Sequence, residues 1–232
     1  MTKTMRIGML LFPDLTQLDL TAPAEVFARL PGADVLYLWK ALEPVVADRG
    51  LRIMPNARLA DVDALDVICV PGGAGQIAMM DDEEVLGFLR RIEPGCKLVT
   101  SVCTGSLLLG AAGLLKGYKA TCHWSSIDQL ALLGCQPVRA RVVRDRNRIT
   151  GAGVTSGIDL ALTVAAELLG HEVAKEIQLQ MEYDPAPPYT TGSPERAPIE
   201  LVRRVAEKIA PFIARRRAAT EKAAAKLGRS GG

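Results

Sequence analysis

Short apolar runs alternate with helical patterns along the chain, and this alternation limits the possible folds more than any other feature. Continuous apolar runs, which predict strands buried on both faces, occur at 6–12, 66–70 and 97–102. Helical patterns follow these runs at 21–29, 81–92 and 105–112, after turns that contain glycine or proline. Repeated strand, turn and helix units predict an α/β fold with a doubly wound, mostly parallel sheet, in which ligands bind at the carboxyl ends of the strands.

The second half of the chain continues this pattern and then changes. Further strands are expected at 119–123, 138–143 and 148–150, and further helices at 125–133 and 157–169. Residues 184–198 hold five prolines and predict an irregular connector. The helical pattern at 199–227 is expected to be broken or bent near Pro211. We therefore expect an α/β domain over residues 1–196 and a basic helical C-terminal extension over residues 197–232.

Composition supports one main α/β domain. The chain has 232 residues, 49% of them hydrophobic, which is enough to bury a full core without disulfides or metals. Only 4% of the residues are aromatic, which favours helices packed on a parallel sheet over a β-sandwich.

Charge is spread unevenly over a chain whose formal net charge is +2. Residues 197–232 contain nine Lys or Arg against three Glu, a net charge of +6 that leaves −4 for residues 1–196. The total charge is too small to suggest nucleic-acid binding, so we expect no nucleic-acid partner. The basic tail is expected to be a solvated helix or part of a dimer surface.

The cysteines and the N-terminal segment bear on the cellular compartment of the protein. Five cysteines make an odd number, form no CxxC pair and sit mostly inside apolar segments, so a disulfide framework is not expected. The apolar run at 7–12 is too short for a signal-sequence core or a membrane span. These features predict a cytoplasmic protein with reduced thiols and no membrane partner. The two histidines do not make a metal site with cysteines at these spacings, so no metal is expected.

Cys103 is the strongest candidate for a functional residue. The run Leu98–Val102 predicts a buried strand, and Gly105 opens the helical pattern only two residues after it ends. Such a turn is a nucleophile elbow, which exposes one side chain at the carboxyl edge of the sheet. Free backbone N–H groups and the positive end of the helix dipole are expected to lower the pKa of a thiol placed there. We predict that Cys103 is functional and that the other four cysteines are inert core residues.

Two further segments are expected at the same edge. Asp19 lies between Leu18 and Leu20 in the predicted loop after the first strand, where partial burial would raise its carboxyl pKa and suit it to proton transfer. A helix-capping role explains this aspartate equally well. Gly72 and Gly73 end another strand and leave backbone N–H groups free for a ligand, although a glycine pair alone usually marks only a turn.

Several motifs together resemble the DJ-1/PfpI superfamily. They are the run SVCTGS around Cys103, the Pro-Gly-Gly turn at 71–73, Thr-Cys-His-Trp at 121–124 and Gly-Ala-Gly-Val-Thr-Ser-Gly-Ile-Asp at 151–159. Their order and spacing cover most of the chain. Within the superfamily, Leu-Asp-Leu-Thr at 18–21, the segment 178–183 followed by Pro-Ala-Pro-Pro, and the basic tail are similar to the isocyanide hydratases.

The resemblance implies a flavodoxin-like fold, a homodimer and the hydration of isocyanides to N-substituted formamides through a cysteine thioimidate. It implies that Cys103 is the nucleophile and that Asp19 hydrogen-bonds its sulfur and shuttles protons. It also implies that Gly72, Gly73 and Thr104 line the pocket with backbone amides, and that Val154 shapes an apolar substrate cavity. No metal or organic cofactor is required by this chemistry.

Three alternatives remain open on the sequence. Peptidases and glyoxalases of the superfamily carry a glutamate where this chain has Asp19, and the peptidases place a histidine where it has Thr104, so a glyoxalase-like activity is the nearest enzymatic rival. Ligand-sensing domains of AraC-type regulators share the CTGS and His-Trp motifs, but the thirty or so residues after the connector are too few for a DNA-binding module with two helix-turn-helix motifs. Redox sensing by Cys103 needs only an exposed cysteine with a low pKa.

Overall fold

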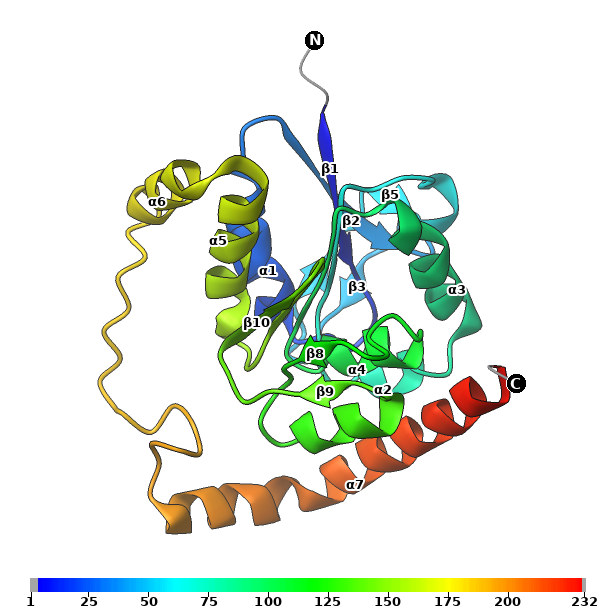
Figure 1. Cartoon of the computed structure of the whole chain (residues 1–232), viewed down its shortest axis with the longest axis vertical. Helices are drawn as coiled ribbons and strands as arrows, with labels where there is room; N and C mark the ends of the chain where they lie inside the picture. The colour runs from blue at the N-terminus through cyan, green and yellow to red at the C-terminus, as the bar shows by residue number, and fades with distance from the viewer. Residues whose placement is uncertain (1–3, 231–232) are drawn as a thin grey trace.

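A seven-stranded sheet forms the centre of the molecule (Figure 1). The computed structural model describes residues 4–230. The strand order is β10-β11-β7-β6-β1-β2-β5, and every neighbouring pair is parallel except β10 with β11. The strands of this sheet are β1 (Met5–Leu10), β2 (Ala33–Trp39), β5 (Ala57–Arg58), β6 (Val67–Val70), β7 (Leu98–Val102), β10 (Val142–Asp145) and β11 (Arg148–Gly151). The prediction of a doubly wound, mostly parallel sheet is confirmed.

Helices cover both faces of this sheet. Figure 1 shows α1 and α5 on one face and α3 on the other. The helices are α1 (Gln17–Phe27), α2 (Gln76–Met79), α3 (Glu83–Ile92), α4 (Gly105–Ala111), α5 (Ser156–Leu169), α6 (His171–Gln180) and α7 (Ile199–Ser230). Three 3-10 helices join them: η1 (Leu59–Asp61), η2 (Glu93–Gly95) and η3 (Ile127–Leu133). Two small sheets pair β3 (Val45–Val46) with β4 (Arg52–Ile53) and β8 (Lys119–Ala120) with β9 (Gln136–Pro137).

The apolar runs read from the sequence form the core. The central strands β6 and β7 are buried along their whole length, which explains why their sequences show no polar alternation. Within residues 4–230 no helix combines the length and the apolar character that crossing a membrane would require.

Three helical segments differ from the prediction. Helix α1 begins at Gln17 rather than at Thr21, so Pro23 lies inside the helix and Asp19 belongs to its first turn. The expected α-helix at 125–133 is the 3-10 helix η3, which ends at Gly134 in the left-handed conformation. A further helix, α6, follows Gly170 directly, where the sequence predicted only a helix end. The placement of Asp19 in a loop is therefore corrected to a helical position.

Helix α7 also differs, because it continues through Pro211 without a break. Its second half packs against α2, α4 and η3, and Figure 1 shows it crossing the end of the molecule beside α2 and α4. Arg216, Thr220 and Ala223 are buried on its inner face. The expectation of a solvated helix is therefore wrong for this face. The ends of the two predicted domains, residues 1–3 and 231–232, lie outside the described residues.

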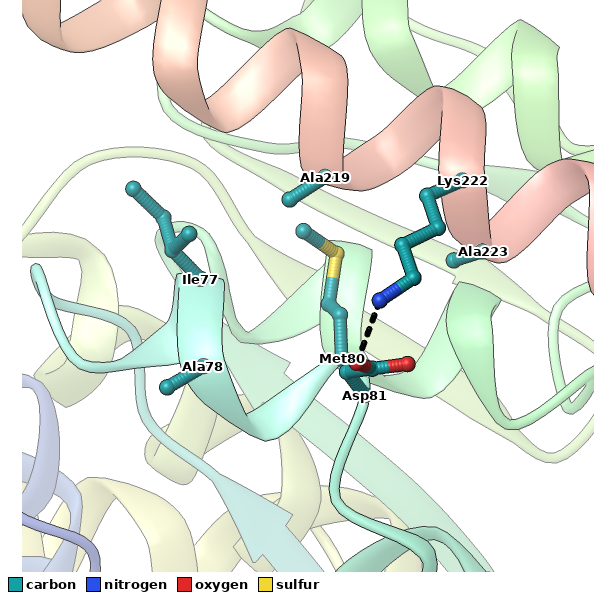
Figure 2. A pocket seen from close by; sticks show the side chains of 7 residues that line it. All are labelled: Ile77, Ala78, Met80, Asp81, Ala219, Lys222 and Ala223. Atoms are coloured by element: carbon teal, nitrogen blue, oxygen red, sulfur yellow. Dashed lines mark hydrogen bonds and ion pairs between the residues drawn. The ribbon is translucent and has the colours of Figure 1, made fainter.

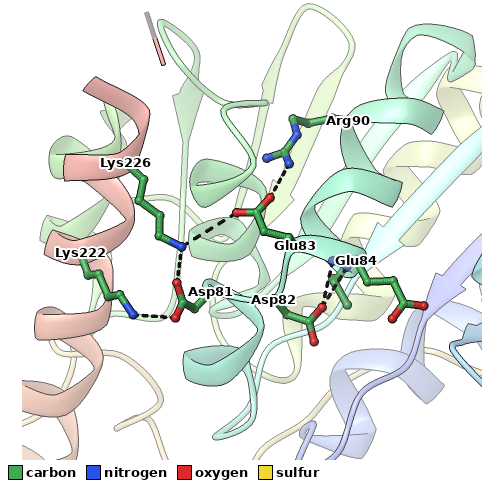
Figure 3. A network of polar contacts seen from close by, with 8 residues as sticks. Asp81, Asp82, Glu83, Glu84, Arg90, Lys222 and Lys226 are labelled. Atoms are coloured by element: carbon green, nitrogen blue, oxygen red, sulfur yellow. Dashed lines mark hydrogen bonds and ion pairs between the residues drawn. The ribbon is translucent and has the colours of Figure 1, made fainter. Parts of the chain in front are cut away.

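Ion pairs add to the contact between α7 and the body. Figure 3 shows Lys222 and Lys226 reaching the carboxylate of Asp81, which follows α2, and the Lys222 Nζ to Asp81 Oδ2 distance is 2.6 Å. One turn earlier, Arg217 pairs with Asp128 of η3 at 2.7 Å. These pairs are exposed, and such pairs contribute at most about 1 kcal/mol each. The buried inner face of α7 and these ion pairs both hold the helix against the body.

Candidate active site

Cys103 occupies the turn between β7 and α4, as the nucleophile-elbow motif predicts. Its backbone has φ 58°, a left-handed conformation that is rare for a residue with a side chain and that marks a strained turn. Gly105 makes the turn possible, because a Cβ at this position would lie 2.1 Å from the carbonyl oxygen of Val70. The Cys103 backbone N–H donates to the carbonyl of Gly151 at 3.0 Å, which joins the turn to the end of β11. The thiol is thus held at the carboxyl edge of the sheet.

Asp19, Gly72 and Thr104 meet at this edge. The Gly72 backbone N–H donates to Asp19 Oδ2 at 2.9 Å, and the Gly73 backbone N–H donates to Thr104 Oγ1 at 3.1 Å. A Cβ on Gly72 would lie 2.5 Å from the Thr104 nitrogen and 2.9 Å from Asp19 Oδ2, so only glycine allows this approach. The structure therefore brings together four of the predicted site residues with Cys103.

Burial sets the protonation of Asp19. The side chain is fully buried, and this raises the carboxyl pKa from 3.8 to about 7. The hydrogen bond from Gly72 and the nearby Cys103 thiol oppose the rise, whereas the charge of Asp48 adds to it. Its Oδ1 atom has no hydrogen-bond partner of ordinary length among the described residues. This carboxyl group can therefore gain or lose a proton near neutral pH, which is what a general acid and base requires.

The Cys103 thiol does not have the lowered pKa that the sequence predicts. Burial raises its pKa well above the ordinary value, and the neighbouring Asp19 and Cys122 raise it further. The Thr104 backbone N–H and the guanidinium of Arg216 act in the opposite direction. The thiol is only 5% exposed, so desolvation outweighs the favourable dipoles of the turn. A negative charge is thus disfavoured on Cys103 while Asp19 is ionised, and the two groups titrate as a coupled pair.

Val154 and His123 lie at the margins of this group. Val154 is half-buried against the core in the turn between β11 and α5, close in sequence to the Gly151 carbonyl that binds the Cys103 N–H. His123 Nδ1 hydrogen-bonds Ser125 Oγ at 2.8 Å. Burial and the charge of Arg216 lower the His123 pKa to about 4, so this ring is neutral at ordinary pH.

A model of the DJ-1/PfpI family matches residues 5–167, which is more than half of the chain. The chain belongs to the DJ-1/PfpI family. It is 52% identical to an isonitrile hydratase of Pseudomonas putida over 223 residues, which are 96% of this chain and 98% of that protein. A solved THiJ/PfpI family protein from Pseudomonas syringae superposes with a TM-score of 0.91 at 46% identity, covering 94% of this chain and 91% of that one.

This chain is also similar to part of a transcription regulator. The HTH-type transcriptional regulator GbdR of Pseudomonas aeruginosa is 32% identical over 189 residues, which are 77% of this chain but only 50% of the regulator. Similarity to the hydratase is therefore both higher in identity and more complete in coverage than similarity to the regulator.

Arg216 lies beside the site of this DJ-1/PfpI family member and was missed from the sequence. The basic run Arg215-Arg216-Arg217 looks like one solvated stretch of helix. One signal was present, since Phe212, Arg216, Thr220 and Ala223 recur at the spacing of a single helix face, and the last two are small enough to pack closely. This spacing indicates that Arg216 lies on the face of the helix that packs against the body of the protein.

A cavity elsewhere in the molecule does not belong to this site. This cavity has a volume of about 340 Å³, and Figure 2 shows its lining side chains, which come from α2, Met80, Asp81 and α7. Its walls are Ile77, Ala78, Met80, Asp81, Ala219, Lys222 and Ala223, and include neither Cys103 nor Asp19. Within residues 4–230, no cluster of three or more His, Cys, Asp or Glu side chains is arranged to hold a metal ion.

Proposed function

We propose that this chain hydrates isocyanides to N-substituted formamides. The observation that carries the proposal is the 52% identity to an isonitrile hydratase over 98% of that protein. The geometry agrees with this chemistry, because a cysteine on a nucleophile elbow lies beside a buried carboxyl group whose pKa is about 7. A nucleophile and a proton carrier are the two groups that the reaction requires.

In the first step, the Cys103 sulfur attacks the terminal carbon of the isocyanide. Asp19 accepts the thiol proton and delivers it to that carbon, so a C–S bond and a C–H bond form and the product is a thioimidate. The raised pKa of Asp19 suits both transfers, because a carboxyl group that titrates near pH 7 holds and releases a proton at similar cost.

In the second step, water adds to the thioimidate carbon. The Asp19 carboxylate takes one proton from this water and passes it to the nitrogen, so that a C–O bond and an N–H bond form. Asp19 then takes the remaining hydroxyl proton as the carbonyl forms and the C–S bond breaks, and it returns this proton to the sulfur. The sulfur returns to its starting state and an N-substituted formamide leaves. The overall change is the addition of one water to one isocyanide, so no electrons are gained or lost.

The other predicted residues have supporting roles in this proposal. The backbone amides of Gly72, Gly73 and Thr104 line the pocket beside the reacting carbon and nitrogen. Val154 forms part of an apolar wall that would accept the organic group of the substrate. The Gly72 and Gly73 N–H groups donate to Asp19 and Thr104 rather than standing free for a ligand, so in this proposal they orient the proton carrier and the residue after the nucleophile.

An assay with an aryl isocyanide tests the function directly. We expect the formamide to accumulate in proportion to enzyme concentration over many turnovers, with the thiol regenerated. A parallel incubation with methylglyoxal tests the glyoxalase alternative, and mass analysis of Cys103 after mild peroxide tests redox sensing. Consumption of methylglyoxal without any turnover of the isocyanide would reject our assignment.

We also propose that the chain forms a homodimer in the cytoplasm. All five cysteines are free, as expected in a reducing compartment. Large apolar side chains are exposed on α6, on the connector and at the start of α7, namely Leu179, Tyr189 and Ile199, with 82%, 77% and 62% of their surface exposed. A second copy of the chain would cover them.

Light scattering on the purified chain should give about twice the monomer mass of 24.9 kDa. Leu179→Glu should shift this mass toward the monomer, because a charge in an apolar contact is costly. As a control, Asp63→Asn at an exposed position between η1 and β6, away from α6, should leave the dimer intact. A wild-type mass of one chain at micromolar concentration would reject the dimer.

A further inference from the structure

Arg216 is a buried cation without an anionic partner. Only 5% of its surface is exposed, although Arg203, Arg204, Arg215 and Arg217 of the same helix face solvent. None of the ion pairs described for residues 4–230 includes it, whereas the neighbouring Arg217 pairs with both Asp128 and Glu221. A buried charge is costly unless it is paired, so a position like this calls for an explanation.

The contacts of Arg216 satisfy it only in part. Nη1 donates to Ser126 Oγ at 3.1 Å, and Nη2 reaches the Gly73 carbonyl oxygen at 3.5 Å, the upper limit for a hydrogen bond. The guanidinium also lies over the ring of Phe212, with 4.5 Å from its carbon to the ring centre. Nε is buried and has no hydrogen-bond partner among the described residues. All these partners are neutral, so the positive charge remains uncompensated.

The contact with Gly73 places this charge at the active site. The Gly73 N–H donates to the hydroxyl of Thr104, the residue directly after Cys103. The same cation lowers the pKa values of the Cys103 and Cys122 thiols and of the His123 ring. Arg216 therefore acts on the Cys103 sulfur from α7, whereas the acidic neighbour Asp19 acts on it from α1.

We propose that Arg216 is a positioning residue that stabilises the thiolate of Cys103, so that docking of α7 completes the active site. The inference rests on the proposed role of Cys103 as the nucleophile. When Asp19 takes the thiol proton, the resulting thiolate and the buried guanidinium form the opposite-charge pair that the resting site lacks. The cost of burying Arg216 is thereby offset in the state that reacts.

Several other groups act on the same sulfur, and the test must separate them from Arg216. Asp19 reaches it from α1, and Cys122 from the segment after β8. Asp48 acts on Asp19, and Asp128 acts on Cys122. Only Arg216 contributes a positive charge among these groups. Its removal should therefore raise the pKa of Cys103, while loss of Asp19 would remove negative charge and lower it.

The experiment compares the pH dependence of Cys103 alkylation in variants of the full chain. Iodoacetamide labels each cysteine, and peptide mass analysis follows Cys103 and Cys122 separately. Arg216→Gln removes the charge but keeps donors for Ser126 and Gly73, whereas Arg216→Lys keeps the charge. We expect Cys103 in Arg216→Gln to react about tenfold more slowly at pH 7, with its pH profile moved to higher pH, and Arg216→Lys to recover part of the loss.

Arg217→Gln is the matched control, because it removes an exposed arginine from the next position of the same helix. Its alkylation profile should match the wild type. Thermal melting shows whether each variant is folded, and the Gln and Lys variants are compared only at temperatures where both are native. The proposal is overturned if Cys103 reacts alike in Arg216→Gln and the wild type, or if only the profile of Cys122 moves. Since alkylation needs no isocyanide, a wild type that fails to make formamide would reject the proposed function without deciding this result.

Discussion

Cys103→Ala is expected to reduce formamide production from an aryl isocyanide by a factor on the order of a thousand or more, to the uncatalysed rate. The reason is that the substitution removes the only atom proposed to form a bond with the substrate carbon. The buried site stays otherwise intact, because alanine is smaller than cysteine and the thiol is not part of a disulfide. The measurement is the initial rate of formamide appearance at saturating substrate.

Cys135→Ala is a suitable control for this prediction. Cys135 is also a buried free cysteine, but it follows Gly134 at the end of η3 and has no contact with Asp19 in the structure. We expect that variant to keep wild-type turnover and to lose only stability. Normal formamide production by a folded Cys103→Ala protein would show that the elbow cysteine does not form the intermediate.

The position of Cys103 was predictable because its determinants are local. A strand with no polar alternation, a two-residue turn and a glycine at the start of the next helix lie within eight residues, and the close approach of Val70 to Gly105 explains that glycine. The parallel sheet then brings Gly72 and the segment around Asp19 to the same edge without further information. Most of the site therefore follows from the rule that ligands bind at the carboxyl ends of the strands in α/β folds.

The predicted helix boundaries are wrong where one residue is compatible with two local structures. The sequence predicts a helix that opens at Thr21 with Pro23 in its first turn, a common place for proline, whereas α1 begins four residues earlier at Gln17 and holds Pro23 in its interior. Gly170 was read as an end, and it is also the N-terminal boundary of α6. In both cases the packing of the helix on its neighbours overrides the local signal.

Tertiary burial accounts for what the sequence could not show. The helix dipole at the elbow predicts a lowered thiol pKa, but burial of Cys103 in the core raises it instead. The role of Arg216 depends on the second half of α7 returning to the sheet edge after an irregular connector, a contact between residues 143 positions apart. The net charge of the tail does not distinguish this one buried arginine from its solvated neighbours, so it could not reveal the position of Arg216.

Asp19→Asn is expected to stabilise the protein at neutral and alkaline pH while removing its activity. In the unfolded chain Asp19 titrates at its ordinary pKa of 3.8, and in the native protein at about 7. The native state therefore binds the proton more tightly, and its advantage, complete below pH 3.8, is lost as the pH rises to about 7. The loss amounts to about 4 kcal/mol, since each tenfold change in proton affinity is worth about 1.4 kcal/mol. Asparagine is neutral at every pH and keeps the acceptor oxygen for the Gly72 N–H.

Urea unfolding at several pH values between 4 and 8 measures this effect. The variant and the wild type should have similar stability at pH 4, and the variant should gain several kcal/mol over the wild type by pH 8, whereas the exposed Asp61→Asn should differ from the wild type by no more than about 0.5 kcal/mol. Formamide production should fall by about a hundredfold or more in the same Asp19→Asn protein, because its amide cannot carry the proton between thiol, substrate and water. A stability difference that is flat across this pH range would mean that the buried carboxyl group stays ionised, and a carboxylate of that kind could not act as the acid of the first step.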